Sequence, residues 1–186
     1  MESIGKILDF IKSCEKLKDT PRSASHTSSG KRESVAEHSW RMALLAVCLL
    51  PYFPELDAKK VLTMCLIHDL PEQITGDVSA AELPDAQNKL SSERSAAADL
   101  FSLLPEDLYR LLTLEYDDYS FINSPEARFA KAIDKAETII QHNQGSNSED
   151  FNYAFNLEYG KAFFEDDEIL KYIRSILDSD TLSHIK

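Results

Sequence analysis

The chain has 186 residues, of which 43% are hydrophobic and 28% are charged, a composition typical of one folded globular domain. Its 20 Lys and Arg against 32 Asp and Glu give a formal net charge of −12, which disfavours a nucleic-acid polymer as partner. No apolar run approaches the roughly 18 residues that a membrane-spanning helix needs, and the N-terminus lacks the features of a secretory signal. We therefore expect a soluble, cytoplasmic protein without a membrane partner.

Hydrophobic residues recur at helical spacing along nearly the whole chain, and alternating strand-like runs are missing. This pattern predicts an all-α fold. A first helix is predicted from the apolar stripe between Ile4 and Leu17. Residues 23–30 are rich in Ser and Thr and break the helical pattern, so the sequence predicts a loop there.

The second and third helices are predicted from the signals at their ends. Ser34 and Glu37 have the spacing of a capping box, which predicts a helix from Val35 to about Leu50. A third helix is expected to open near Asp57. It carries four apolar residues toward the core, namely Val61, Leu62, Cys65 and Leu66, and then reaches His68 and Asp69. Pro71 disfavours helical geometry in the residue before it, so these two polar residues are predicted to lie at a helix end.

The second half of the chain is also predicted to be helical. Ser124 followed by Pro125 is typical of a helix start, and this long helix is predicted to run toward His142 and to end before Gly145. Further helices are expected over residues 91–104, 106–115, 151–164 and 167–177.

The three cysteines lie far apart within apolar helical patterns, at Cys14, Cys48 and Cys65. None is part of a C-x-x-C pair, which is the spacing typical of many zinc and redox sites. They are predicted to be reduced core residues.

Two histidines stand beside acidic residues at predicted helix ends or starts. His38 follows an acid on the second helix, and His68 precedes Asp69 after an apolar run. An ionised carboxylate in such a buried place is costly unless it is paired or binds a cation. Asp134 lies on the long helix beside small residues, where another helix can approach closely. Two imidazoles with carboxylates suit Mn, Fe, Co, Ni or Zn, so the sequence predicts a divalent metal site.

The order of these residues resembles that of the HD-domain metal-dependent phosphohydrolases. The segment 68–77 (HDLPEQITGD) resembles the HDxxExxxGD segment of the 5′-deoxynucleotidase branch, which contains YfbR-like and HD-domain-containing-protein-2-like enzymes. Residues 33–39 (ESVAEHS) are similar to the entry to the second helix in that branch. The resemblance covers residues 17–142 and implies a single HD domain over residues 1–186. The C-terminal helices, 151–178, would pack on the motif core.

The resemblance also implies a cofactor and a reaction. His38, His68, Asp69 and Asp134 would hold one divalent ion, whose identity the sequence does not specify. The enzyme would hydrolyse a nucleoside 5′-monophosphate, preferably the deoxy form, to a nucleoside and phosphate. A homodimer is also implied. Two alternatives stay open: an HD phosphohydrolase of another nucleotide, and a nucleotide-sensing domain that keeps the metal without turnover.

Three further residues receive roles from the resemblance. Glu72 would orient or deprotonate the attacking water, and Asp77 would hold a sugar hydroxyl or that water. Arg22 would bind the phosphate, since a guanidinium suits a phosphate dianion. Lys31 and Arg32 are near enough in sequence to add positive charge, but we expect them to be solvated loop charges.

The sequence departs from the branch at Ser23, where YfbR-type enzymes carry a tryptophan thought to exclude the ribose 2′-hydroxyl. Unless Trp40 or a tyrosine fills that space, the preference for deoxy over ribo substrates is expected to be modest, about 10- to 100-fold. Base identity is expected to matter little, because the motifs include no base-reading residue. His142 and His184 receive no role.

Overall fold

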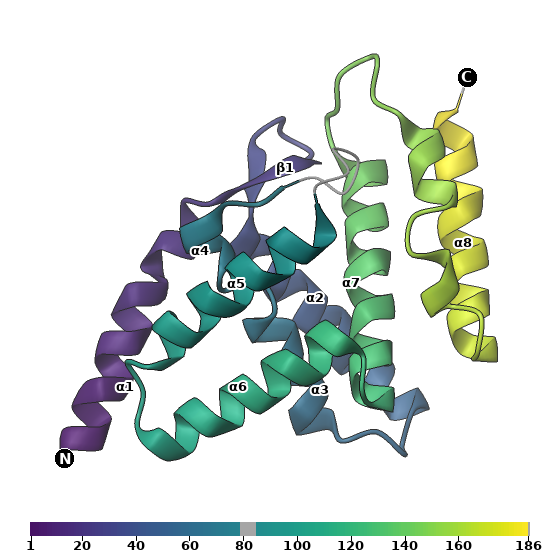
Figure 1. Ribbon diagram of the computed structural model, residues 1–186. Helices are drawn as coiled ribbons and strands as arrows, with labels where there is room; N and C mark the ends of the chain where they lie inside the picture. Colours follow the sequence, from purple (N-terminus) through teal and green to yellow (C-terminus); the bar gives the residue numbers. More distant parts are fainter. Residues whose placement is uncertain (79–84, 186) are drawn as a thin grey trace.

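The structure, a computed structural model, describes residues 1–78 and 85–185. Helices dominate this part of the chain, which confirms the prediction of a mostly α fold (Figure 1). The long helix α7 (Pro125–Gln144) lies at the centre and packs against α2 (Val35–Leu49), α3 (Ala58–Ile67) and α8 (Glu168–His184). Within the described residues, no helix has the length and apolar character needed to cross a membrane.

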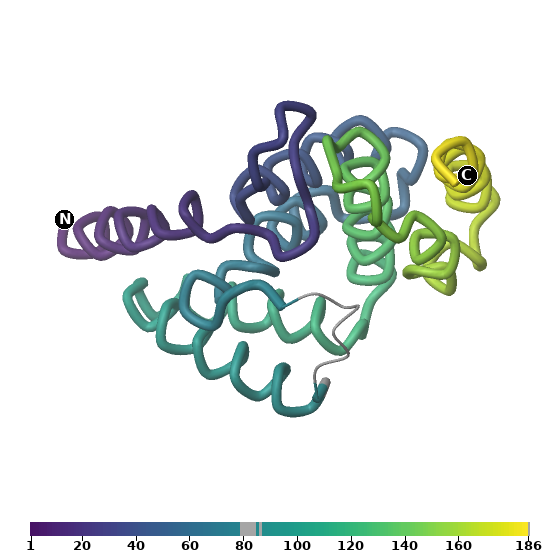
Figure 2. The backbone as a smooth tube through the Cα atoms, turned by 90° about the horizontal axis from the view of Figure 1, so that it is seen from above, coloured from purple at the N-terminus to yellow at the C-terminus, as the bar shows by residue number. Residues whose placement is uncertain are grey.

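The N-terminal helix α1 (Glu2–Ser13) continues into a 3₁₀ turn, η1 (Cys14–Lys18), and projects away from the body of the protein (Figures 1 and 2). The prediction of a loop over residues 23–30 is wrong in part. Instead, β1 (Pro21–His26) and β2 (Arg32–Ser34) form a two-stranded antiparallel sheet. Small polar residues give this hairpin no alternating pattern, and contacts with α7 help to hold it in place.

Close backbone packing joins this hairpin to the end of α7. The Gln141 side chain donates a hydrogen bond to the His26 carbonyl, and the Ser146 amide donates to the Thr27 carbonyl at 3.0 Å. A methyl group at Gly145 would clash with the same His26 carbonyl oxygen. Glycine therefore allows the end of α7 to approach the hairpin that carries Arg22.

The predicted capping box of α2 and the predicted start of α3 near Asp57 are confirmed. The Ser34 hydroxyl accepts from the Glu37 amide at 3.2 Å, and the Glu37 carboxylate accepts from the Ser34 amide at 2.8 Å. Asp57 caps α3 by accepting from two backbone amides. The prediction that Leu66 faces the core is wrong, because its side chain is exposed on the outer side of α3.

The remaining elements differ from the prediction mainly at their ends. A single turn, α4 (Glu72–Thr75), is followed by α5 (Ala86–Phe101), whose Asp85 cap starts it earlier than residue 91. Helix α6 (Glu106–Phe121) runs past residue 115, and α8 runs past residue 177. The helix predicted over residues 151–164 is wrong, since two 3₁₀ turns, η4 (Tyr153–Leu157) and η5 (Lys161–Phe163), occupy that segment. Gly160, at φ +65°, separates them.

Two hydrophobic clusters support the fold. The larger one joins α2, α3, α7 and α8, and the smaller one joins α1, η1, α5 and α6. Of the three free cysteines, Cys65 is buried as predicted, Cys14 is half-buried and Cys48 is exposed. The core prediction is therefore wrong for Cys48, which lies on the outer side of α2.

The approach of α7 to the hairpin gives a stability prediction. Gly145→Ala should lower the free energy of unfolding by about 1–3 kcal/mol, because the added methyl meets backbone that cannot move aside alone. Gly5→Ala, in α1 with no neighbour within 4 Å, should raise it by about 0.5–1 kcal/mol through helix propensity. Urea unfolding of both variants checks the pair. Equal effects of the two substitutions would contradict the close packing at Gly145.

Candidate functional site

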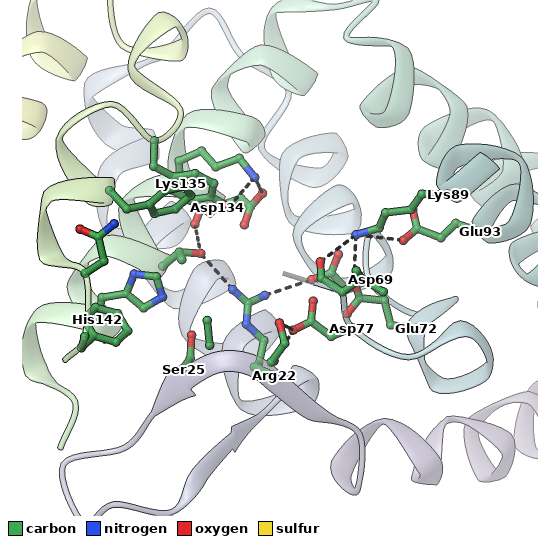
Figure 3. Close-up of a pocket in the computed structure, with 18 of the residues that line it drawn as sticks. Arg22, Ser25, Asp69, Glu72, Asp77, Lys89, Glu93, Asp134, Lys135 and His142 are labelled. Atoms are coloured by element: carbon green, nitrogen blue, oxygen red, sulfur yellow. Dashed lines mark hydrogen bonds and ion pairs between the residues drawn. The ribbon is translucent and has the colours of Figure 1, made fainter. Parts of the chain in front are cut away.

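A cavity of about 520 Å³ opens between β1, the segment after α3, α5, α7 and the η4 region (Figure 3). Both charged and aromatic side chains line it. The charged group comprises Arg22, Asp69, Glu72, Asp77, Lys89, Glu93, Asp134 and Lys135, and the aromatic group comprises His142, Phe151, Phe155 and Tyr159. The cavity thus brings together predicted site residues from three places. These are Arg22 on β1, the three acidic residues after α3 (Asp69, Glu72 and Asp77), and Asp134 on α7.

The structure brings the four predicted metal ligands together. His38 comes from α2, His68 ends α3, Asp69 follows it, and Asp134 lies on α7. His38 Nε2 lies 3.3 Å from Asp134 Oδ1 and 3.8 Å from Asp69 Oδ2. His68 Nε2 lies 3.0 Å from the same Asp69 oxygen.

The other nitrogen of each imidazole is already engaged. His68 Nδ1 lies 3.0 Å from the Cys65 carbonyl oxygen, which only accepts, so Nδ1 carries a hydrogen and the neutral ring offers a lone pair at Nε2. His38 Nδ1 bonds to the Glu137 carboxylate. Both Nε2 atoms are buried, and neither has hydrogen-bond geometry toward the carboxylate oxygen beside it. Two such nitrogens beside two carboxylates fit a divalent cation.

A second group of possible ligand atoms shares His38 and consists of Glu33, His38 and Glu137. The Glu137 carboxylate is already paired there, because Arg41 Nε donates to it at 2.6 Å and His38 Nδ1 contacts its other oxygen. A cation in that group would compete with the Arg41 guanidinium. The group containing His68 and Asp69 therefore suits an ion better.

The carboxylates around His38 also set its charge. Although burial lowers the pKa of His38, the nearby Glu137 and Asp134 raise it to about 9. Binding of an ion at Nε2 would therefore displace a proton from this ring, which makes ion affinity increase with pH.

Asp134 is held in one orientation by two donors. Tyr119 Oη and Lys135 Nζ donate to its Oδ2 atom at 3.0 and 2.9 Å, which leaves Oδ1 beside His38. Lys135 also reaches the Tyr159 hydroxyl at 3.0 Å. Although burial opposes ionisation, Lys135 and His38 hold the pKa of Asp134 well below its usual value. Asp134 is therefore an ionised and oriented ligand candidate.

Glu137 is a site residue that the sequence analysis missed. It lies three residues after Asp134 on the same face of α7, is fully buried, and receives hydrogen bonds from His38 and Arg41. The spacing of three residues was the available signal. The sequence does not show that His38 lies opposite this position, which is what gives Glu137 its role.

Arg22 enters the cavity from β1, where the resemblance placed a phosphate ligand. Its Nη2 donates to Thr138 Oγ1 at 3.0 Å, and its Nη1 lies 3.5 Å from Asp69 Oδ2. Figure 3 shows Arg22 between the Asp69 group and His142. The guanidinium is thus anchored beside the candidate ion ligands.

As expected for solvated loop charges, Lys31 and Arg32 lie outside the cavity, and its additional positive charge comes from other residues. Lys31 is exposed and pairs with Glu37 at 3.0 Å, and Arg32 bonds to the Ser23 carbonyl, so neither lines the cavity. Lys89 and Lys135 line it instead. Lys89 Nζ lies 3.4 Å from Glu93 Oε1 and 3.9 Å from Glu72 Oε1. No sequence pattern marks either lysine.

Glu72 starts α4 and is buried, with its Oε2 atom unpaired. Burial and the neighbouring Asp69 and Asp77 raise the pKa of Glu72 to about 10. Such a raised pKa is a frequent property of groups that transfer protons.

Asp77 is tied to the position where the family resemblance expects a tryptophan. Its Oδ2 atom accepts from the Ser23 amide at 2.5 Å and from the Ser23 hydroxyl at 2.9 Å. Ser23 therefore orients Asp77 rather than adding bulk. Trp40 is exposed and does not line the cavity, whereas Tyr159 does.

Comparisons with known proteins agree on one family. Residues 14–172 match the family model described as HD domain. The chain is 34% identical over 136 residues to a protein named 5′-deoxynucleotidase HDDC2 from Bos taurus, covering 73% of this chain and 65% of that protein. It is 33% identical over 144 residues to 5′-deoxynucleotidase hdd1 from Schizosaccharomyces pombe, covering 73% and 70%. The matched region thus spans about two thirds of these relatives.

Solved structures agree with this comparison. A protein from Magnetospirillum magnetotacticum MS-1, described as a predicted metal-dependent phosphohydrolase, superposes with a TM-score of 0.83 at 27% identity, covering 99% of this chain and 97% of that chain. A conserved hypothetical protein from Pyrococcus furiosus gives a TM-score of 0.69 at 28% identity, covering 93% and 98%.

The buried Glu72 gives a pH-dependent stability prediction. Between its ordinary pKa of 4.5 and the folded value of about 10, the unfolded chain releases a proton that the folded protein keeps, so stability falls as pH rises. Glutamine has no carboxyl group to ionise, so Glu72→Gln removes this pH-dependent loss of stability. The substitution should stabilise the ion-free protein by about 1–3 kcal/mol at pH 8.5, and by less at pH 5.5. Urea unfolding in chelator measures the difference.

The matched control is Glu106→Gln, at an exposed position on α6, which should change stability by less than about 0.5 kcal/mol at either pH. A Glu72→Gln variant that is destabilised at pH 8.5, or whose effect does not depend on pH, would contradict the buried, protonated state of Glu72.

Proposed function

The chain belongs to the HD domain family, and from this membership we propose that it is a metal-dependent 5′-deoxynucleotidase that hydrolyses deoxynucleoside 5′-monophosphates to nucleoside and phosphate. The observation that carries the proposal is the pair of buried Nε2 atoms of His38 and His68, which make no hydrogen bond and lie beside Asp69 and Asp134, two carboxylates that line the same cavity as Arg22. The names of the Bos taurus and Schizosaccharomyces pombe relatives support the same activity.

The cofactor in this proposal is one divalent ion held by His38, His68, Asp69 and Asp134. Two imidazole nitrogens and two carboxylates suit Mn, Fe, Co, Ni or Zn. When bound, such an ion supplies Lewis-acid activation of water and of a phosphoryl oxygen. Glu137 and the Cys65 carbonyl hold the two rings by their Nδ1 atoms, as partners of metal-ligating histidines commonly do.

Phosphate binding is assigned to Arg22. Its guanidinium carries Nη1 and Nη2 toward Asp69 and Thr138, and a phosphate dianion would exchange these weaker contacts for charge-assisted hydrogen bonds. Lys89 and Lys135 add positive charge to the cavity. In a protein of net charge −12, these three side chains give an anionic substrate a local docking point.

Proton transfer is assigned to Glu72. Its buried, unpaired carboxyl lies in the cavity with Asp69 and Arg22. A divalent ion held at Asp69 would lower the pKa of Glu72, because a nearby cation favours the ionised carboxylate. In that ionised form Glu72 would accept a proton from the attacking water, and this proton would then be available to the leaving 5′-oxygen. Asp77, oriented by Ser23, is assigned to a sugar hydroxyl or to the attacking water.

Phosphate release from a panel of deoxy and ribo monophosphates tests the proposal. After reloading with Mn, Co, Ni, Fe or Zn, the protein should release phosphate from dAMP and related deoxynucleotides with at least one metal. Glu72→Ala should lower kcat by about 10² to 10⁴ while the metal stays bound. Release only from a cyclic or triphosphate substrate, or nucleotide binding without turnover under every metal, would contradict the proposed activity.

We also propose a homodimer, as the resemblance implies. Helix α1 projects from the body (Figure 2) and exposes Ile4, Leu8 and Ile11, each more than half accessible. Light scattering should give the mass of two chains, and Leu8→Asn should shift the mass toward one chain. Asp9→Asn, on the same helix, should leave the dimer intact. A monomer for the unmodified chain would contradict this proposal.

A further inference from the structure

His142 lies on the same face of α7 as two residues of the candidate site. It follows Asp134 by eight residues, with Thr138 halfway between, and all three line the cavity. At a helix rise of about 1.5 Å per residue, the backbone of His142 is about 12 Å from that of Asp134 along the axis. Figure 3 shows its ring on the opposite side of Arg22 from Asp69 and Glu72.

A chain of hydrogen bonds from α8 determines which nitrogen of His142 carries a hydrogen. The Asp180 carboxylate accepts from Asn143 Nδ2 at 2.9 Å, so Asn143 Oδ1 faces the other way. That oxygen accepts from Asn156 Nδ2 at 3.3 Å. Asn156 Oδ1 then accepts from His142 Nδ1 at 2.8 Å. Each step follows from the one before, because a carboxylate cannot donate.

The Nε2 atom of His142 is consequently a hydrogen-bond acceptor. It is buried, has no partner in the described structure, and belongs to a side chain that lines the cavity. Burial lowers the pKa of His142, so the ring stays neutral near pH 7. A buried acceptor without a donor is costly, and a donor on a bound molecule would satisfy it.

One aromatic ring lies against His142, and two more aromatic side chains line the same cavity. The Phe151 ring lies 5.1 Å from the His142 ring in an edge arrangement, and Phe155 lies 5.1 Å from Tyr159. All four side chains line the cavity, with Phe151 beside His142 and Tyr159 beside Lys135. Aromatic faces next to one acceptor suit a flat, nitrogen-containing ring that carries an N–H donor.

We propose that His142, Phe151 and Phe155 form a nucleobase subsite in which His142 Nε2 accepts a hydrogen bond from an N–H group of the base. This inference rests on the proposed function, because the phosphate must lie at Arg22 and the candidate ion ligands. A nucleoside monophosphate is long enough to reach from there to His142. The base therefore contributes to recognition, in contrast to the sequence-based expectation that its identity matters little.

Three substrates separate the base from the rest of the molecule. These are dAMP, its analogue that lacks the 6-amino group, and 2-deoxyribose 5-phosphate, which has no base. The protein should prefer dAMP to the analogue by about 10- to 100-fold in kcat/KM, because the analogue leaves the acceptor unpaired. Equal kcat/KM values for dAMP and the analogue would overturn the proposal.

Variants then assign the effect to the subsite. In His142→Phe the ratio for dAMP over the analogue should fall to about one, while kcat/KM for the base-free sugar phosphate stays unchanged. Phe155→Leu should lower kcat/KM for dAMP about 10-fold through lost stacking and leave the sugar phosphate unchanged. His184→Phe, at a histidine outside the cavity lining, is the matched control and should behave like the unmodified protein.

The outcomes distinguish the two proposals. Equal losses on dAMP and on the sugar phosphate in both cavity variants would indicate a general structural defect and would overturn the subsite. Phosphate release from the sugar phosphate and dAMP without discrimination would overturn the subsite and leave the activity intact. No release from any monophosphate would overturn the proposed function itself.

Discussion

The burial of several carboxylates at one point constrains the rest of this structure. Asp134 and Glu137 are buried on α7, and Asp69 lies close by at the end of α3. Ionised groups in such a place are costly unless cations or donors surround them. Arg22 pairs with Asp69, Arg41 with Glu137, and Lys135 with Asp134, so each acid has one basic partner. The two imidazoles occupy the space between these pairs.

This arrangement explains why elements far apart in the chain must meet. His38, Asp69 and Asp134 come from α2, the end of α3 and α7, and the same three helices share the larger hydrophobic cluster. The hairpin brings Arg22 to the same place because Gly145 allows α7 to approach it closely. The fold therefore positions the site through packing, and ion pairs made by Arg22 and Arg41 connect the hairpin and α2 to its acidic residues. Along α7, Asp134 and His142 both line the cavity, eight residues apart.

Features encoded by local spacing could be predicted from the sequence. The capping box at Ser34, the Ser124-Pro125 start of α7 and the helix end at His68 depend on neighbouring residues, and the structure has each of them. The hairpin and the 3₁₀ turns at residues 153–163 could not be predicted, because long-range contacts stabilise them. Glu137, Lys89 and Lys135 lie in ordinary helical sequence, and only the partner across the cavity gives them a role. The acceptor state of His142 depends on Asp180, far along the chain.

The central claim is that the ion-binding group consists of His38, His68, Asp69 and Asp134, and that Glu33 and Glu137 are outside it. Competition with a coloured chelator measures the affinity of the protein for Co or Mn. The account predicts that Asp69→Asn weakens this affinity more than about 10-fold, since even the partners of ligands change affinity by about 10- to 100-fold. Glu33→Gln should change it far less. An Asp69→Asn protein with unchanged affinity, together with a Glu33→Gln protein that has lost the ion, would contradict the account.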